Sequence, residues 1–164
     1  MRDDRRHDRP RTPAQRGGAQ KGGDGDEALG RSKGGLSTKI HAVVDALGNP
    51  VAFHLTGGQT SELAGADALL PTIAAPVVLA DKGYDAEVRV LAVLRDAGKV
   101  AIIPPRRNRK DRRDYDRDLY AARHLIENFF CRLKQYRAIA TRYDKTRRNF
   151  LAAVHLAATV ITLN

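Results

Sequence analysis

The chain has 164 residues, with 29 Lys or Arg against 19 Asp or Glu, and its net charge of +10 favours an acidic partner such as nucleic acid. This length suits one ordinary domain with its own core. A membrane or secreted protein is not expected: the most apolar run, residues 151–163, is too short to span a bilayer, the start of the chain lacks an apolar signal segment, and Cys131 is the one cysteine. We therefore expect a soluble, cytoplasmic protein.

Residues 1–35 are predicted to form a disordered, basic, glycine-rich arm. They hold eight of the fourteen glycines and hardly any apolar residues, so they cannot offset the entropy of ordering. The arm could touch DNA phosphates, or it could be a non-native leader. The following residues, 36–103, are slightly acidic, with five Lys/Arg against seven Asp/Glu, and the basic surplus lies on either side of them. This separation suits an acidic metal site flanked by phosphate-binding surface.

A β-hairpin is predicted at the start of the folded part. Residues 37–45 and 51–56 alternate between apolar and polar side chains, as strands do, and the Leu-Gly-Asn-Pro sequence at 47–50 supplies a turn. After the hairpin, Thr60 or Ser61 can cap a helix that runs to about Leu70.

The rest of the chain alternates strand and helix patterns. The predicted elements are a strand over residues 76–80, a helix over 85–97 ended by Gly98, a strand over 100–103, an exposed charged loop over 106–118, a long helix over 119–134 and a terminal helix from about Asn149. The run at 76–80 has no polar alternation, which is typical of a strand covered on both faces in a parallel or mixed sheet. The order of elements predicts an α/β fold.

The long helix presents a polar stripe opposite its apolar face. Turning about 100° per residue places Tyr120, Arg123, Glu127 and Lys134 on one narrow side. The residues on the opposite side are Ala122, Leu125, Ile126, Phe129 and Leu133. Charges on the solvated face of an amphipathic helix need no further role, so the stripe alone leaves both interpretations open.

Asp81 stands at the carboxyl end of the buried strand over 76–80. Functional side chains gather at this edge of α/β sheets. An Asp before a helix or turn also serves as an N-cap, and position alone does not separate these two roles.

These residues carry a resemblance. The spacing Tyr120-x2-Arg123-x3-Glu127-x6-Lys134 resembles the Y-R-E-K signature around the last catalytic acid of the DDE transposases of bacterial insertion sequences, of the insertion-sequence-five type. The block ENFFCRLKQYRAIATRYDK is similar to the corresponding family block, and VLADKGYD is similar to the motif around the second acid. The resemblance runs from about Gly30 to the end of the chain and includes GRSKGGLSTKIHAVVDALGNP and TGGQTSE.

The resemblance implies a ribonuclease-H-like core, a mixed sheet with flanking helices, over residues 36–164. It implies that Asp81 and Glu127 are catalytic and hold two Mg²⁺ or Mn²⁺ ions, which suits phosphodiester chemistry because such ions accept carboxylate, water and phosphate oxygens. Tyr120, Arg123 and Lys134 would support DNA binding. The implied partners are the terminal inverted repeats of an element, target DNA and further copies of the chain, with no membrane.

The chain departs from the family pattern at its start. The family's first acid lies on a strand ahead of GRSKGG, but here Asp3, Asp4 and Asp8 follow no apolar strand, so none is assigned that role. An amino-terminal DNA-recognition domain is also missing. We expect an N-terminally truncated, incomplete enzyme, with an upstream-frame polypeptide as a further partner. The alternatives are a non-catalytic DNA-binding derivative that regulates or inhibits transposition and a general basic nucleic-acid-binding module.

Overall fold

The computed structural model describes residues 27–32, 35–110 and 113–163. Its central feature is an antiparallel hairpin of β2 (Gly35–Val44) and β3 (Pro50–Gly57), in a register that pairs Ile40 with Leu55. The turn between them is closed by the Asp45 carboxylate, which accepts hydrogen bonds from the backbone N–H groups of Leu47 and Asn49. The predicted hairpin is confirmed, with each strand slightly longer than expected.

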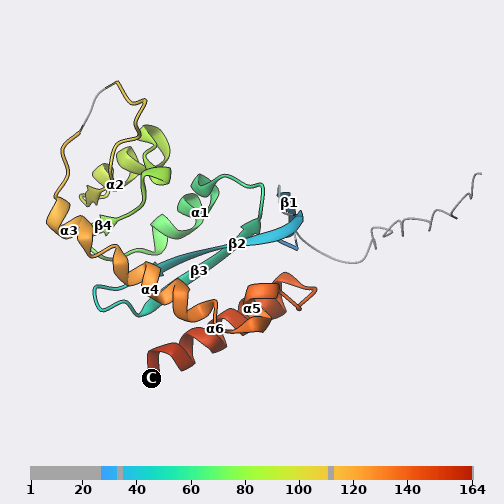
Figure 1. Ribbon diagram of the computed structural model, residues 1–164. Helices are drawn as coiled ribbons and strands as arrows, with labels where there is room; N and C mark the ends of the chain where they lie inside the picture. Colours follow the sequence, from blue (N-terminus) through green and yellow to red (C-terminus); the bar gives the residue numbers. More distant parts are fainter. Residues whose placement is uncertain (1–26, 33–34, 111–112, 164) are drawn as a thin grey trace, which may run out of the picture.

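Helices cover both faces of this hairpin (Figure 1). One face packs against α4 (His124–Leu133) and α6 (Arg147–Leu163), where Phe129 and Phe53 lie 5.7 Å apart between ring centroids. The other face packs against α1 (Glu62–Leu69), which the Ser61 side chain caps as predicted. Both faces of the hairpin are therefore covered. Its apolar side chains contact α4 and α6 on one face, and His41 contacts α1 on the other.

A second cluster of elements follows α1. It contains the short 3-10 turn η1 (Leu70–Thr72), β4 (Val77–Leu79), the 3-10 turn η2 (Lys82–Tyr84), the π-helical turn η3 (Glu87–Leu91), α2 (Ala92–Asp96) and β5 (Val100–Ile102). β4 and β5 pair in parallel, with Val78 opposite Ala101. Val78, Val90, Leu91, Leu94 and Ile103 of this cluster form a second core together with Ala66 of α1. The predicted strands and the helix ended by Gly98 are confirmed, although the helix starts with a wide turn.

The carboxyl-terminal helices build the larger core. α5 (Arg137–Thr141) ends where Arg142 takes a left-handed conformation, and α6 then packs along α4 and β3. Phe150 and Val154 of α6 are fully buried beside Leu133 of α4. In the described part of the chain, no helix is both long and apolar enough to cross a bilayer.

Two sequence-based predictions about the strands need correction. Residues 30–32 belong to a short strand, β1 (Gly30–Ser32), which pairs with the start of β2, and Ala28 is fully buried, so regular structure begins before Leu36. Most of the predicted disordered arm, residues 1–26 and 33–34, lies outside the described residues. The expected single mixed sheet consists instead of an antiparallel sheet, β1-β2-β3, and a parallel pair, β4-β5, which no described strand joins.

The long helix predicted over residues 119–134 is also wrong as one element. It consists of α3 (Arg117–Ala121) and α4, joined by a tight turn in which the N–H groups of Ala122 and Arg123 donate to carbonyls three residues earlier. Ala122, predicted on the buried face, is exposed. Alanine and arginine both favour helices, so intrinsic propensity does not explain this break.

Candidate active site

Asp81 begins the turn that follows β4. Its Oδ1 accepts a hydrogen bond of 2.6 Å from the backbone N–H of Gly83 and so caps η2. The other oxygen, Oδ2, lies 3.8 Å from Nη1 of Arg123, and the side chain is 51% exposed. The capping role considered from the sequence is therefore confirmed, and one carboxylate oxygen stays directed toward the helix that carries Glu127.

Glu127 lies in the first turn of α4, one turn after Arg123. Its Oε1 forms an ion pair with Nη2 of Arg123, and its side chain is 54% exposed. Phe129 and Leu133 hold the opposite side of this helix in the core. The amphipathic pattern thus anchors α4 on its apolar side and leaves the Glu127 carboxylate accessible to solvent.

One guanidinium group joins the two predicted acids. Nη1 of Arg123 contacts Asp81 and Nη2 contacts Glu127, while the arginine itself is 28% exposed. Two carboxylates that are distant in the sequence therefore face the same cation. The tight turn before α4 places Arg123 at the N-cap position of that helix, between the two acids.

Tyr120 belongs to the same group of side chains. Its ring lies 5.6 Å from the guanidinium carbon of Arg123 and 5.4 Å, between centroids, from the ring of Tyr115. Burial raises the pKa of the Tyr120 hydroxyl, and the charges of Asp81 and Glu127 raise it further against the opposing effect of Arg123. Four of the five predicted site residues thus lie together.

Lys134, the fifth predicted residue, occupies a different place. It follows the last turn of α4 and lines an open groove of about 770 Å³ between the start of β2 and the α5–α6 connection. The other side chains that line this groove include Leu36, Ile40, Phe130, Tyr143 and Lys145. Lys134 therefore lies beside this groove, which Arg142 and Lys145 also line, and not with the acid pair.

A polar cluster behind the Asp81 turn was missed by sequence reasoning. Glu62 pairs with Lys39 at 2.7 Å, and its second oxygen lies 3.7 Å from Nδ1 of His41. The His41 ring also bonds the hydroxyl of Thr56 at 2.8 Å, and burial lowers its pKa. Burial, followed by the charges of Glu62 and Asp81, raises the pKa of Tyr84 to about 12. The TGGQTSE segment, which ends at Glu62, was the only sign of this cluster in the sequence, because the other members lie far from Glu62 along the chain.

The acid pair can form part of a magnesium site. Mg²⁺ usually takes one or two protein carboxylates and completes its octahedron with waters and substrate phosphates. Asp81 and Glu127 supply two half-exposed carboxylates, and both contact the Arg123 guanidinium. Within the described residues, no group of three His, Cys, Asp or Glu side chains is arranged to hold an ion.

Comparison with known proteins identifies the family. The model of the transposase DDE domain matches residues 7–163, and the chain belongs to this family. A relative from Brucella ovis, named "Putative transposase for insertion sequence element IS6501", is 38% identical over 129 residues, which cover 78% of this chain and 99% of the relative. No solved structure matches the chain. Membership in the DDE transposases of insertion sequences, expected from the motifs, is thereby confirmed.

Proposed function

We propose that the chain is the catalytic portion of a DNA transposase that binds element ends and carries out metal-dependent strand cleavage and transfer. The observation that carries this proposal is the convergence of Asp81 and Glu127 on one guanidinium. Family membership and the positive net charge support DNA as the substrate. The α/β elements are consistent with a ribonuclease-H-like core, which is part of the proposal.

Each residue has a role in this proposal. Asp81 and Glu127 would hold two Mg²⁺ or Mn²⁺ ions, which when bound activate the attacking oxygen and stabilise the departing one. Oδ1 of Asp81 keeps its bond to the Gly83 N–H, so this carboxylate is oriented before any ligand arrives. Arg123 would bind a phosphate oxygen, with Tyr120 stacked against its guanidinium.

Lys134 would neutralise a phosphate further along the DNA. Its position at the end of α4, beside the groove that also contains Lys145, would extend the contact surface beyond the acid pair. Such contacts fix the register of the duplex without reading its sequence. The terminal inverted repeats and the target DNA are the proposed ligands of this surface.

The described residues provide two acids of the proposed site. We propose that a third carboxylate comes from another polypeptide, such as an upstream-frame product or a second copy of the chain. In the described part of the chain β4 pairs only with β5, so no described strand occupies its other edge. A parallel strand added there would end beside Asp81.

A non-catalytic role is the second candidate. The acids form a pair and not a triad among the described residues, while the chain keeps its basic surplus. A chain that binds element ends without cutting them would act as a regulator or inhibitor of transposition. In this case Asp81 and Glu127 would be dispensable for DNA binding.

The two candidates are separated by a nicking assay on supercoiled DNA with the full chain. The catalytic proposal predicts nicking once a polypeptide that supplies the third carboxylate is present. This nicking should require Mg²⁺ or Mn²⁺ and should be lost in Glu127→Gln and Asp81→Asn. The control variant is Asp67→Asn, which removes a carboxylate paired with the exposed Arg89. DNA binding without nicking under these conditions, unchanged in Glu127→Gln, would contradict the catalytic proposal and favour the regulator.

A further inference from the structure

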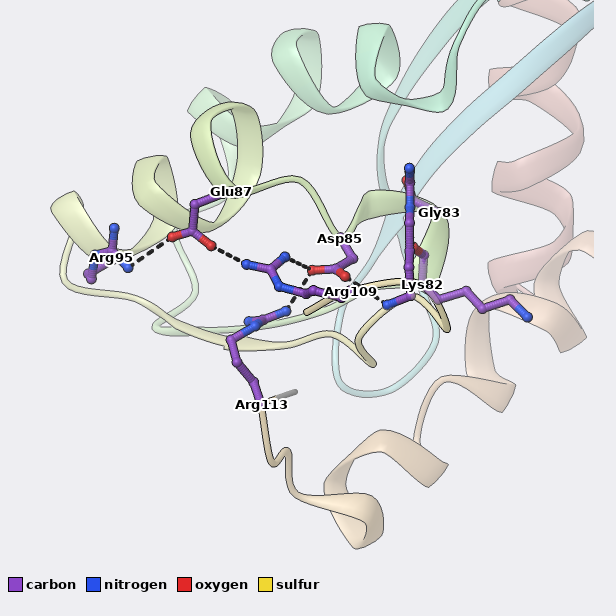
Figure 2. A network of polar contacts seen from close by, with 8 residues as sticks. Lys82, Gly83, Asp85, Glu87, Arg95, Arg109 and Arg113 are labelled. Atoms are coloured by element: carbon purple, nitrogen blue, oxygen red, sulfur yellow. Dashed lines mark hydrogen bonds and ion pairs between the residues drawn. The ribbon is translucent and has the colours of Figure 1, made fainter. Parts of the chain in front are cut away.

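Asp85 is a buried carboxylate with an unusual number of donors. It ends the turn that Asp81 begins, and its side chain is 1% exposed. Oδ2 accepts the backbone N–H of Arg106 at 2.7 Å, and Oδ1 accepts Nη2 of Arg113 at 2.8 Å and Nη1 of Arg109 (Figure 2). A buried carboxylate is strongly unfavourable without such partners. The hydrogen bonds of Asp85 therefore hold Arg106, Arg109 and Arg113 against its carboxylate.

All three donors come from the connection between β5 and α3. Arg109 also pairs with Glu87 of η3, which in turn pairs with Arg95 of α2. Arg106 additionally donates from Nε to the carbonyl of Lys82 and from Nη2, at 2.6 Å, to the carbonyl of Gly83. The connection, which the sequence predicted to be an exposed charged loop, is thus bound to the Asp81 turn and to Asp85 through Arg106, Arg109 and Arg113.

This binding links the two acid-bearing segments. On one side, the turn held by Arg106 has Asp81 as its cap. On the other side, the connection leads directly into α3 and α4, which carry Glu127. The direct contact between the segments, from Arg123 to Asp81, is 3.8 Å long and half exposed, and such surface pairs contribute little. The buried Asp85 cluster is the stronger link.

We propose that Asp85 is a positioning residue that fixes Arg106, Arg109 and Arg113 of the β5–α3 connection on the Asp81 turn and thereby sets the separation of Asp81 and Glu127. Asp85 itself points into the cluster of arginines, where both of its oxygens already accept hydrogen bonds. The role rests on the proposed metal-dependent function, because separation matters only if both acids hold the same ions. Outer-shell partners that contact metal ligands commonly change metal affinity by about 10–100-fold when replaced. Asp85 acts on the acids through the arginines, so we expect a loss near the lower end of this range.

Two measurements on the full chain test this role. The first is the distance between spin labels on the native Cys131, which is exposed on α4, and on Val88→Cys, whose native side chain is 80% exposed on η3. The second is Mn²⁺ affinity of the unlabelled chain. Both are made for Asp85→Asn and for Arg113→Gln, which leaves Asp85 bound to Arg109 and the Arg106 N–H. The matched control is Asp67→Asn, which breaks the exposed pair with Arg89.

We expect one narrow distance distribution in the unsubstituted chain and in Asp67→Asn, and a broader one in Asp85→Asn, with Mn²⁺ affinity at least about tenfold lower. If Asp85→Asn does not fold, Arg113→Gln serves as the test variant in its place and should also broaden the distance distribution. Unchanged distances in the folded Asp85 and Arg113 variants would overturn the proposal. Absence of Mn²⁺ binding in the unsubstituted chain would refute the proposed function instead, while the distances still report on the link.

Discussion

Replacing Arg123 by glutamine should strengthen metal binding at the acid pair. The Arg123 guanidinium contacts both Asp81 and Glu127, so it neutralises the two carboxylates that a metal ion would use. A divalent ion must compete with this charge and then remain close to it. Glutamine is two atoms shorter and uncharged, so it no longer neutralises the carboxylates, which then repel each other more and attract a cation more strongly.

The expected size of the effect follows from Coulomb's law. A charge of +1 at roughly 5 Å from a divalent ion costs about 1.7 kcal/mol at a dielectric constant near 80. Because both acids are half exposed, salt reduces this figure to about 1 kcal/mol, or roughly a fivefold gain in affinity. The same substitution should weaken DNA binding, since Arg123 would no longer hold a phosphate.

The assay is a Mn²⁺ titration of the full chain, followed by the loss of the free-ion electron paramagnetic resonance signal at fixed ionic strength. Arg89→Gln is the control, because it also removes one arginine charge but one whose partner is Asp67. Affinity that falls or stays the same in Arg123→Gln, while Arg89→Gln behaves like the unsubstituted chain, would refute this reasoning.

Three further predictions concern other parts of the molecule. Burial lowers the pKa of His41, so the unfolded chain takes up a proton first as pH falls below 6.5. The stability contributed by neutral His41 is therefore complete above that pH and is lost as pH falls toward the lower pKa of His41 in the folded chain. His41→Gln should flatten the dependence of the urea midpoint on pH in this range. An unchanged slope would contradict this prediction. Gly65→Ala should lower the urea midpoint, because the added Cβ would lie 2.2 Å from Nδ1 of His41. This overlap should cost about 1–3 kcal/mol, which exceeds the gain in helix propensity. A higher midpoint would show that α1 can move away from His41. Lys134→Gln should reduce the salt dependence of DNA binding by about one unit of slope, whereas Lys99→Gln, whose amine bonds the carbonyl of Ile73, should not; equal slopes for all three proteins would exclude Lys134 from the DNA surface.

The local elements were predictable because their signals are local. Alternation and turn chemistry gave the β2–β3 hairpin, and Ser61 and Gly98 marked a helix start and a helix end correctly. The break between α3 and α4 was not predictable, since Ala122 and Arg123 both favour helix. The early strand β1 was hidden by glycines, and its pairing with β2 depends on contacts that composition does not reveal.

The candidate site was predictable only as far as its motifs reach. The family resemblance, and not spacing or position alone, implied that Asp81 and Glu127 would converge. In the structure both carboxylates contact Arg123, and Tyr120 lies beside that guanidinium. Lys134 was assigned to the same stripe but lies beside a separate groove. The links that Asp85 makes to distant arginines could not be read from the sequence, because any exposed loop can carry such charges.

A shared metal centre is tested most directly by a double-mutant cycle of Mn²⁺ binding with Asp81→Asn and Glu127→Gln in the full chain. If the two carboxylates hold the same ions, either single variant should lose nearly as much affinity as the double variant, because one acid alone cannot form the site. Losses that simply add, or single variants that bind like the unsubstituted chain, would show that Asp81 and Glu127 are independent surface acids and would contradict a shared metal centre.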